Sequence, residues 1–185
     1  MINLVKGQKI ILGHTNVTLG LGWKPSTNGA DFDLDCSAFM LGSDGKLISD
    51  ENFIFYNNLV SPDGALIHGE DDRTGGNSEE GDDETIIVDV TKLSPSVSEI
   101  VFLVTIHEAT ERNQNFGQVS DSYIRIVNNK NNEEIAKYEL NEDFSIETSV
   151  VFGRLYKKND EWKFDAVGVG ERKDLQYYVN KYSKN

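Results

Sequence analysis

Short runs in which apolar and polar residues alternate recur along the chain, and they constrain its fold more than any other feature of the sequence. In VTLGLGW (17–23) the large apolar residues occupy every second position, which is the pattern of a β-strand with one buried face. The same pattern recurs over 86–90, 124–126 and 162–166. Two further runs, 53–56 and 100–106, are apolar on both faces, which predicts two central strands.

Turn residues separate these runs. Asp44-Gly45, Asn128-Asn129 and Asn159-Asp160 are typical of hairpin turns. About nine or ten short strands connected in this way predict the all-β class, with two antiparallel sheets packed as a β-sandwich. Residues 175–182 carry apolar side chains at i, i+3, i+4 and i+7, which predicts a C-terminal helix docked on a sheet edge or face. Because the chain has no fixed-period repeat and no Pro- or Ser-rich linker, we expect a single domain over 1–185.

The charge balance restricts the partners of the protein. With 31 Asp and Glu against 18 Lys and Arg, the formal net charge is −13, so we expect no charge-driven binding to nucleic acid and expect cations as natural partners. The N-terminal residues do not read as a signal peptide, so we expect a cytoplasmic location. The lone Cys36 excludes an internal disulfide and a Cys-rich zinc site.

Much of the negative charge lies in one stretch. Residues 69–84 (GEDDRTGGNSEEGDDE) carry eight carboxylates and one Arg, within a longer segment, 57–84, that has no sustained hydrophobic period. A solvated acidic loop is the simplest interpretation of such a run. Its glycines, however, allow tight turns that expose backbone carbonyls, and a loop that binds a hard cation needs six to eight oxygen ligands. The sequence therefore predicts a long acidic metal-binding loop.

A second acidic cluster precedes this loop. On a strand, Asp31, Asp33 and Asp35 share one face, and a continuous apolar series shares the other. Like charges stacked on one face repel each other, and a divalent ion removes that conflict. Two adjacent ions are geometrically possible because Asp33 lies between its neighbours. The spacing is not that of an EF-hand, since Cys36 replaces the required Gly at the sixth position.

The candidate ligands are therefore oxygen donors. Asn57 and Asn58 follow the 53–56 strand and either add amide oxygens to the site or form a simple turn pair. Two other functional classes stay open. One is a C2-like module that uses calcium for recruitment to membranes or proteins, and the other is an enzyme that uses a carboxylate pair such as Glu108 and Glu142. In a chain this acidic some pair of carboxylates looks suitable by chance, so the pair does not indicate catalysis. We therefore expect no enzymatic activity.

Eight motifs along nearly the whole chain resemble the TerD family of bacterial tellurium-resistance and stress-response proteins. They are LGLGW (19–23), DFDLDCSAF (31–39), FIFYNNL (53–59), SPDG (61–64), GDDE (81–84), VTIHEA (104–109), FGQV (116–119) and EDFSIET (142–148).

The resemblance implies a cytoplasmic, calcium-binding β-sandwich associated with resistance to tellurite and other chemical damage, without established enzymatic activity. It implies other stress-resistance proteins as partners, including a membrane-embedded one, and calcium, with two ions, as the cofactor. Where the family pattern has Gly-Asp-Asn, this chain has Glu70-Asp71-Asp72. The residues that the resemblance assigns to the metal are Asp31, Asp33, Asp35, Asn57, Asn58, Asp71, Asp82, Asp83 and Glu84.

Overall fold

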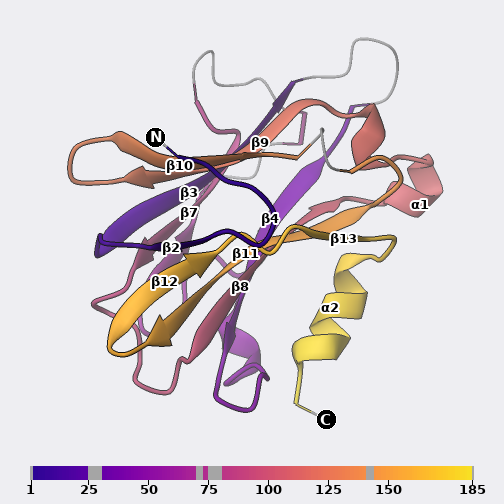
Figure 1. The fold of residues 1–185 in the computed structure, drawn as a ribbon. Helices are drawn as coiled ribbons and strands as arrows, with labels where there is room; N and C mark the ends of the chain where they lie inside the picture. The colour runs from indigo at the N-terminus through magenta and orange to yellow at the C-terminus, as the bar shows by residue number, and fades with distance from the viewer. Residues whose placement is uncertain (1, 25–30, 70–72, 75–80, 141–143, 185) are drawn as a thin grey trace.

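The strands form two sheets that lie face to face in a computed structural model, which describes residues 2–24, 31–69, 73–74, 81–140 and 144–184 (Figure 1). Sheet A has the order β1 (Ile2–Asn3), β10 (Glu133–Glu139), β9 (Ser120–Asn128), β3 (Asn16–Lys24), β7 (Glu84–Asp89) and β6 (Leu66–His68). Sheet B has the order β2 (Lys9–Ile11), β12 (Glu161–Asp165), β11 (Ser149–Lys158), β8 (Glu99–Ile106), β4 (Leu34–Leu41) and β5 (Phe53–Ile54), and β13 (Val169–Glu171) also pairs with β11. The expected two-sheet, strand-rich architecture is confirmed.

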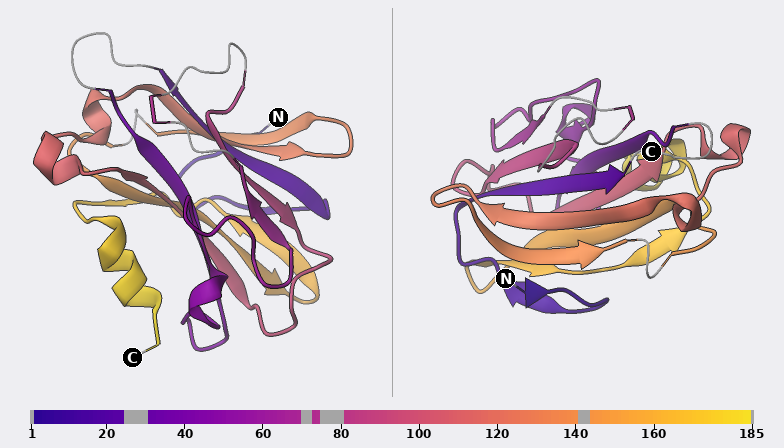
Figure 2. Two further views of the ribbon diagram at one scale, coloured as in Figure 1. Left: turned by 180° about the vertical axis from the view of Figure 1, so that it is seen from behind. Right: turned by 90° about the horizontal axis from the view of Figure 1, so that it is seen from above.

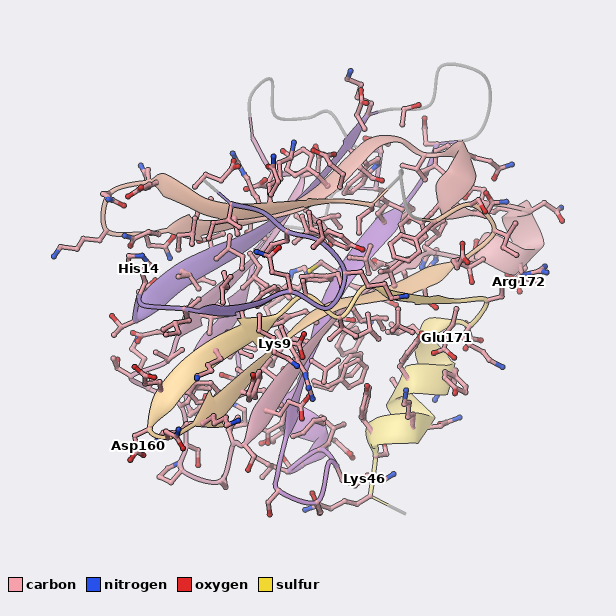
Figure 3. The ribbon with its side chains drawn as sticks, in the orientation of Figure 1. Lys9, His14, Lys46, Asp160, Glu171 and Arg172 are labelled. Carbon is pink, nitrogen blue, oxygen red and sulfur yellow. The ribbon has the colours of Figure 1, made fainter. Side chains whose placement is uncertain are left out.

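The strand pairing is antiparallel with one exception among the described residues. β1 runs parallel to β10, so the expectation of purely antiparallel sheets is wrong at that edge. The predicted hairpins at Asn128-Asn129 and Asn159-Asp160 are present, whereas the Asp44-Gly45 turn is closed by a single bridge between Leu41 and Leu47. At the β11–β12 turn Asn159 and Asp160 have φ angles of 55° and 60°. Asn and Asp tolerate this left-handed conformation better than most residues, and it matches the twist of a tight hairpin. In Figure 3 the hairpin tip at Asp160 and the end of β13 at Glu171 lie on opposite sides of the molecule.

The two sheets lie one above the other in the right-hand view of Figure 2, and the main core fills the space between them. On β4, Cys36, Ala38 and Met40 point into this core. Residues Phe39 and Leu41 of the same strand belong to a second apolar cluster on the outer face of sheet B. Both faces of β4 are therefore buried, because side chains alternate across a strand and each face has its own cover.

The C-terminal helix covers that second cluster. α2 (Leu175–Tyr182) has the predicted bounds and packs on a face of sheet B. Its Tyr178 is fully buried, and the Tyr178 hydroxyl hydrogen bonds with the Ser149 hydroxyl at 3.0 Å and donates to Glu171 Oε2 at 2.9 Å. Burial raises the pKa of Tyr178, and the neighbouring Glu171 carboxylate raises it further. The predicted apolar stripe thus docks the helix, and its one buried polar group is satisfied.

One expectation needs correction, and two further elements were not predicted from the sequence. The run 53–56 is not a central strand, because β5 has only two residues and lies at the edge of sheet B. Its apolar character instead reflects a stack in which Phe53 contacts Phe39 at 4.5 Å between ring centroids. The segment 57–84 contains strand β6, and a second short helix, α1 (Ala109–Arg112), follows β8. No helix in the described part of the chain is long and apolar enough to span a membrane.

Candidate functional site

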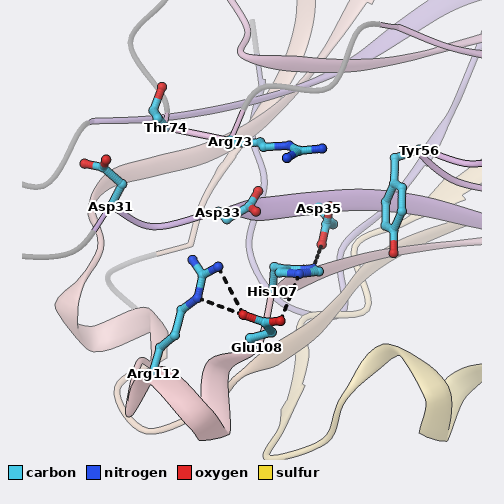
Figure 4. A pocket seen from close by; sticks show the side chains of 9 residues that line it. All are labelled: Asp31, Asp33, Asp35, Tyr56, Arg73, Thr74, His107, Glu108 and Arg112. Atoms are coloured by element: carbon cyan, nitrogen blue, oxygen red, sulfur yellow. Dashed lines mark hydrogen bonds and ion pairs between the residues drawn. The ribbon is translucent and has the colours of Figure 1, made fainter.

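An acidic cavity of ≈ 500 Å³ opens where β4 begins and β8 ends (Figure 4). We call it the acidic cavity, and its lining side chains are Asp31, Asp33, Asp35, Tyr56, Arg73, Thr74, His107, Glu108 and Arg112. The three aspartates of the predicted strand cluster are thus brought together with groups that come from distant parts of the sequence.

The pairing of β4 with β8 positions the aspartates. Leu34 pairs with Ile106, so Asp33 and His107 are the first residues beyond the ladder, and the His107 amide donates to Asp33 O at 2.8 Å. The strand starts at Leu34, so Asp31 and Asp33 precede it rather than forming part of its pleat. Asp31 is exposed, and its carbonyl oxygen accepts from Gln114 Nε2 at 3.1 Å.

Two of the three carboxylates are nearly out of contact with solvent. Asp33 is 8% exposed and Asp35 is 5% exposed. Asp35 points to the outer face of sheet B, the side of β4 that also carries Phe39, and its Oδ2 lies 3.5 Å from His107 Nδ1. Carboxylates this deeply buried are costly unless positive charge or hydrogen bonds compensate them.

The opposite wall of the cavity carries an ion pair. Glu108 Oε2 lies 3.2 Å from Arg112 Nη2, and Glu108 Oε1 lies 3.7 Å from His107 Nε2. Glu108 has a φ of 50°, a left-handed conformation that is unfavourable for this residue and is retained only where neighbouring contacts enforce it. Four carboxylates and two guanidinium groups therefore line the cavity, which leaves it net negative when His107 is neutral.

The predicted ligands at the end of the acidic loop have other partners. Asp82 lies over Gly20 on the outer face of sheet A, where a Cβ on residue 20 would overlap its carboxylate. Arg125 Nε donates to Asp82 Oδ1 at 2.7 Å. Burial and the charge of Asp82 raise the pKa of the adjacent Tyr123 to about 12. Asp83 Oδ2 accepts from the amide of Trp23 at 2.9 Å, so it fixes the end of β3.

Glu84 lies between the two sheets. It is 1% exposed, shares its strand face with Ile86 and Val88, and accepts a hydrogen bond at Oε2 from the Cys36 amide at 2.6 Å. β5 pairs only with Ala38 and Phe39, so the first half of β4 has no strand partner on that side among the described residues. The Glu84 carboxylate accepts the hydrogen bond from the Cys36 amide that a neighbouring strand would otherwise accept.

His68 completes this capping of the β4 edge. Its Nε2 lies 2.9 Å from Cys36 O, and its Nδ1 lies 2.9 Å from Gly69 O. Between them Glu84 and His68 satisfy both backbone groups of Cys36. Burial, followed by the charges of Glu84 and Asp35, raises the pKa of the Cys36 thiol well above its ordinary value. A protonated, buried thiol is a poor nucleophile and a poor metal ligand, so Cys36 has a packing role.

The two predicted asparagine ligands form a turn. Asn57 is exposed, and neither residue lines the acidic cavity. Asn58 Nδ2 donates to the carbonyl oxygens of Glu51 and Phe53 at 3.0 and 2.7 Å, so it holds the chain that leads out of β5. Asp71 lies outside the described residues, as does Glu142 of the carboxylate pair considered for catalysis.

The donor chemistry of the acidic cavity fits a hard divalent cation. Carboxylate oxygens dominate its lining, with the Thr74 and Tyr56 hydroxyls beside them and no thiol. In the part of the chain that the structure describes, no three His, Cys, Asp or Glu side chains form a ready-made metal cluster. Binding an ion therefore requires side-chain rearrangement or ligands from outside the described residues.

Sequence analysis did not assign several residues of the acidic cavity to a metal site. Glu108 was considered only as part of a catalytic carboxylate pair, and His107 before it directly follows a buried strand, which also fits a packing role. Tyr56 was assigned to a strand, although it follows β5 in a turn. Arg112 was not considered, although it stands four residues after Glu108, the spacing at which side chains meet on a helix.

Comparisons with known proteins agree on one family. The TerD domain matches residues 1–182. "Tellurium resistance protein TerD" of Serratia marcescens is 47% identical over 190 residues, which cover 100% of this chain and 98% of that protein. "General stress protein 16U" of Bacillus subtilis is 46% identical, with 98% and 96% covered. A solved structure from Streptomyces coelicolor, described as a homologue of telluride resistance protein (TerD), has a TM-score of 0.74 at 21% identity and covers 90% of this chain and 96% of that one.

Proposed function

The chain belongs to the TerD family, and from this premise we propose that it is a calcium-binding stress-response protein that acts by binding rather than catalysis. The names of its relatives support a role in resistance to tellurite and other chemical damage. The observation that carries the calcium assignment is the acidic cavity, in which Asp33 and Asp35 are buried beside Asp31.

The physical argument for an ion rests on charge. Two nearly buried carboxylates beside a third are unfavourable in a medium of low polarity, and a bound divalent cation offsets that cost. Asp31, Asp33 and Asp35 would hold it, and Thr74 and Glu108 line the same cavity as further oxygen donors. When bound, calcium supplies only positive charge and oxygen coordination, so its role here is to order the surrounding segments. The assignments of Asn57, Asn58, Asp71, Asp82, Asp83 and Glu84 stay predictions.

Calcium is expected to raise the melting temperature, Tm, and EDTA to lower it. An ion that binds only the folded state adds about 2.7 kcal/mol to the free energy of unfolding when its free concentration is about 100-fold above Kd. For a chain of this size, each kcal/mol moves Tm by roughly 2–4 °C. Differential scanning calorimetry over a calcium series measures the shift, with magnesium at equal concentration as the control. A Tm that is the same in calcium and in EDTA contradicts the proposal.

Arg73→Gln is expected to strengthen calcium binding several-fold. The Arg73 guanidinium lines the acidic cavity and faces the aspartates in Figure 4, so its charge opposes the entry of a cation. Isothermal titration calorimetry compares the variant with Arg172→Gln, which removes an exposed guanidinium that does not line the acidic cavity. Weaker binding in Arg73→Gln would mean that this side chain supports the ion site rather than opposing it.

The state of the buried Cys36 thiol also supports a binding protein rather than an enzyme. The Cys36 thiol stays protonated in the core, which makes direct sulfur chemistry on tellurite unfavourable. No feature of the described residues favours the C2-like alternative. We further propose a cytoplasmic location and other stress-resistance proteins, one of them membrane-embedded, as partners, and co-purification from cell fractions with and without calcium tests both.

A further inference from the structure

A second cavity of ≈ 580 Å³ adjoins the acidic cavity on the outer side of sheet B. We call it the aromatic cavity. Most of its lining comes from three segments far apart in the sequence: β5 with the turn after it, the end of β8 with α1, and residues 173–179 at the start of α2. Asp35 of β4 and Thr148 complete the lining. It shares Asp35, Tyr56, His107 and Glu108 with the acidic cavity, so these four residues separate two compartments.

Stacked aromatic rings form one wall of the aromatic cavity. The rings of Phe53 and Phe55 are 4.3 Å apart between centroids at an interplanar angle of 11°, and Tyr56 meets Phe55 edge-on at 5.1 Å. Leu175 and Val179 of α2 add aliphatic surface. Phe55, Leu175 and Val179 are only partly buried, although they adjoin the second apolar cluster. A flat or compact apolar group would cover this wall and remove its surface from water.

The rim of the aromatic cavity is negative. Its lining includes the carboxylates of Asp35, Glu108, Glu111 and Asp174 against a single ammonium, that of Lys173. The ammonium lies 4.8 Å from the Tyr177 ring centroid, and Tyr177 is not part of the lining. The Asp174 carboxylate caps α2 by accepting from the Tyr177 amide at 2.9 Å. Glu108 is paired with Arg112 at 3.2 Å. The other carboxylates of the lining still outnumber its one ammonium, and this net negative charge favours a positively charged ligand and repels an anion.

Aromatic faces and carboxylates together select one class of ligand. The face of an aromatic ring attracts a cation, and burial strengthens that attraction. A metal ion gains little from Phe53, Phe55, Leu175 and Val179, whereas an organic ammonium with an apolar body uses both the rings and the charge. We propose that the aromatic cavity binds a small organic cation, with its apolar body against the partly buried Phe55, Leu175 and Val179 and its charged head toward the carboxylate rim.

The test uses benzyltrimethylammonium as the probe, titrated into the full chain in EDTA so that calcium binding plays no part. Two compounds separate the contributions: benzoate keeps the ring and reverses the charge, and tetramethylammonium keeps the charge and lacks the ring. Two-dimensional 1H–15N NMR follows the amides. We expect saturable shifts at Phe55, Thr105 and Leu175 with benzyltrimethylammonium, and binding weaker by about tenfold for either control compound.

Matched variants locate the site. Glu111 is exposed, so Glu111→Gln should leave the fold intact and weaken binding several-fold. Glu161→Gln makes the same change at an exposed position on β12, next to the hairpin tip, and should bind as the parent chain does. Phe55→Ala should weaken binding by about tenfold. Equal binding of benzoate, shifts confined to residues outside the aromatic cavity, or equal losses in Glu111→Gln and Glu161→Gln would each overturn the proposal.

Discussion

Asp33→Asn is expected to remove at least about half of the calcium-dependent rise in Tm. The substitution keeps the shape of the side chain and removes the charge of a carboxylate that is 8% exposed and lies between Asp31 and Asp35 in sequence. Calcium affinity depends on the number of charged ligands, so we expect Kd to rise at least about tenfold, which corresponds to about 1.4 kcal/mol. Isothermal titration calorimetry gives Kd, and calorimetric melts in calcium and EDTA give the linked stability.

In the absence of calcium the same variant should be as stable as the parent chain, or more so. The reason is that Asp33→Asn relieves repulsion between neighbouring carboxylates when no ion compensates them. The control is Asp160→Asn, which makes the same chemical change at a hairpin position whose side chain is 97% exposed. Asn tolerates the left-handed φ of that residue, so the control should melt and bind calcium like the parent chain. Equal losses of calcium affinity in the two variants would exclude a specific role for Asp33.

Glu84→Ala is expected to lower the free energy of unfolding by about 1–3 kcal/mol, because it leaves the buried amide of Cys36 without its hydrogen-bond acceptor. The loss corresponds to roughly 2–4 °C in Tm for each kcal/mol. Glu84→Gln retains an oxygen acceptor at the same place and should lose less stability than the Ala variant. Urea unfolding with both variants in EDTA measures this difference without any contribution from calcium.

The Glu84 variants also distinguish two roles of this residue, as the acceptor for the Cys36 amide and as a metal ligand. Glu84 does not line the acidic cavity, so calcium should raise the Tm of Glu84→Gln as much as it raises that of the parent chain. If the calcium-dependent rise disappears in Glu84→Gln while the fold persists, Glu84 is a metal ligand, as its place in the acidic run first suggested. That outcome would extend the proposed site into the space between the sheets.

Local sequence patterns predicted the elements whose burial is determined by neighbours in the same strand or helix. The alternation in β3 and the hairpin at Asn159-Asp160 are read from a few adjacent residues, since a pleat has a period of two and a tight turn favours residues that adopt a positive φ. The apolar stripe of α2 gave its bounds for the same reason. The prediction of a central strand at 53–56 was wrong, because apolar residues that pack under a helix at a sheet edge give the same sequence pattern as a central strand.

The candidate site was predicted only in part. The aspartates at 31, 33 and 35 line one cavity, as expected of residues so close in the chain. The late acidic residues were expected to join them, but β7 begins only at Glu84, so Asp82 precedes the strand and does not follow its alternation. Asp82 lies over Gly20 on the outer face of sheet A, and Glu84 lies between the sheets, while Asp35 lies on the outer face of sheet B.

The sequence by itself determined that this chain forms two strand-rich sheets with a C-terminal helix and that its polar chemistry is dominated by carboxylate oxygens, because periodicity and composition are local properties. Only the tertiary structure decided which carboxylates meet. The pairing of β4 with β8 brings His107 to Asp33, and the docking of α2 beside β5 creates the aromatic cavity next to Asp35. Such contacts depend on how distant segments pack. The pattern of side chains within one segment does not determine which other segment packs against it.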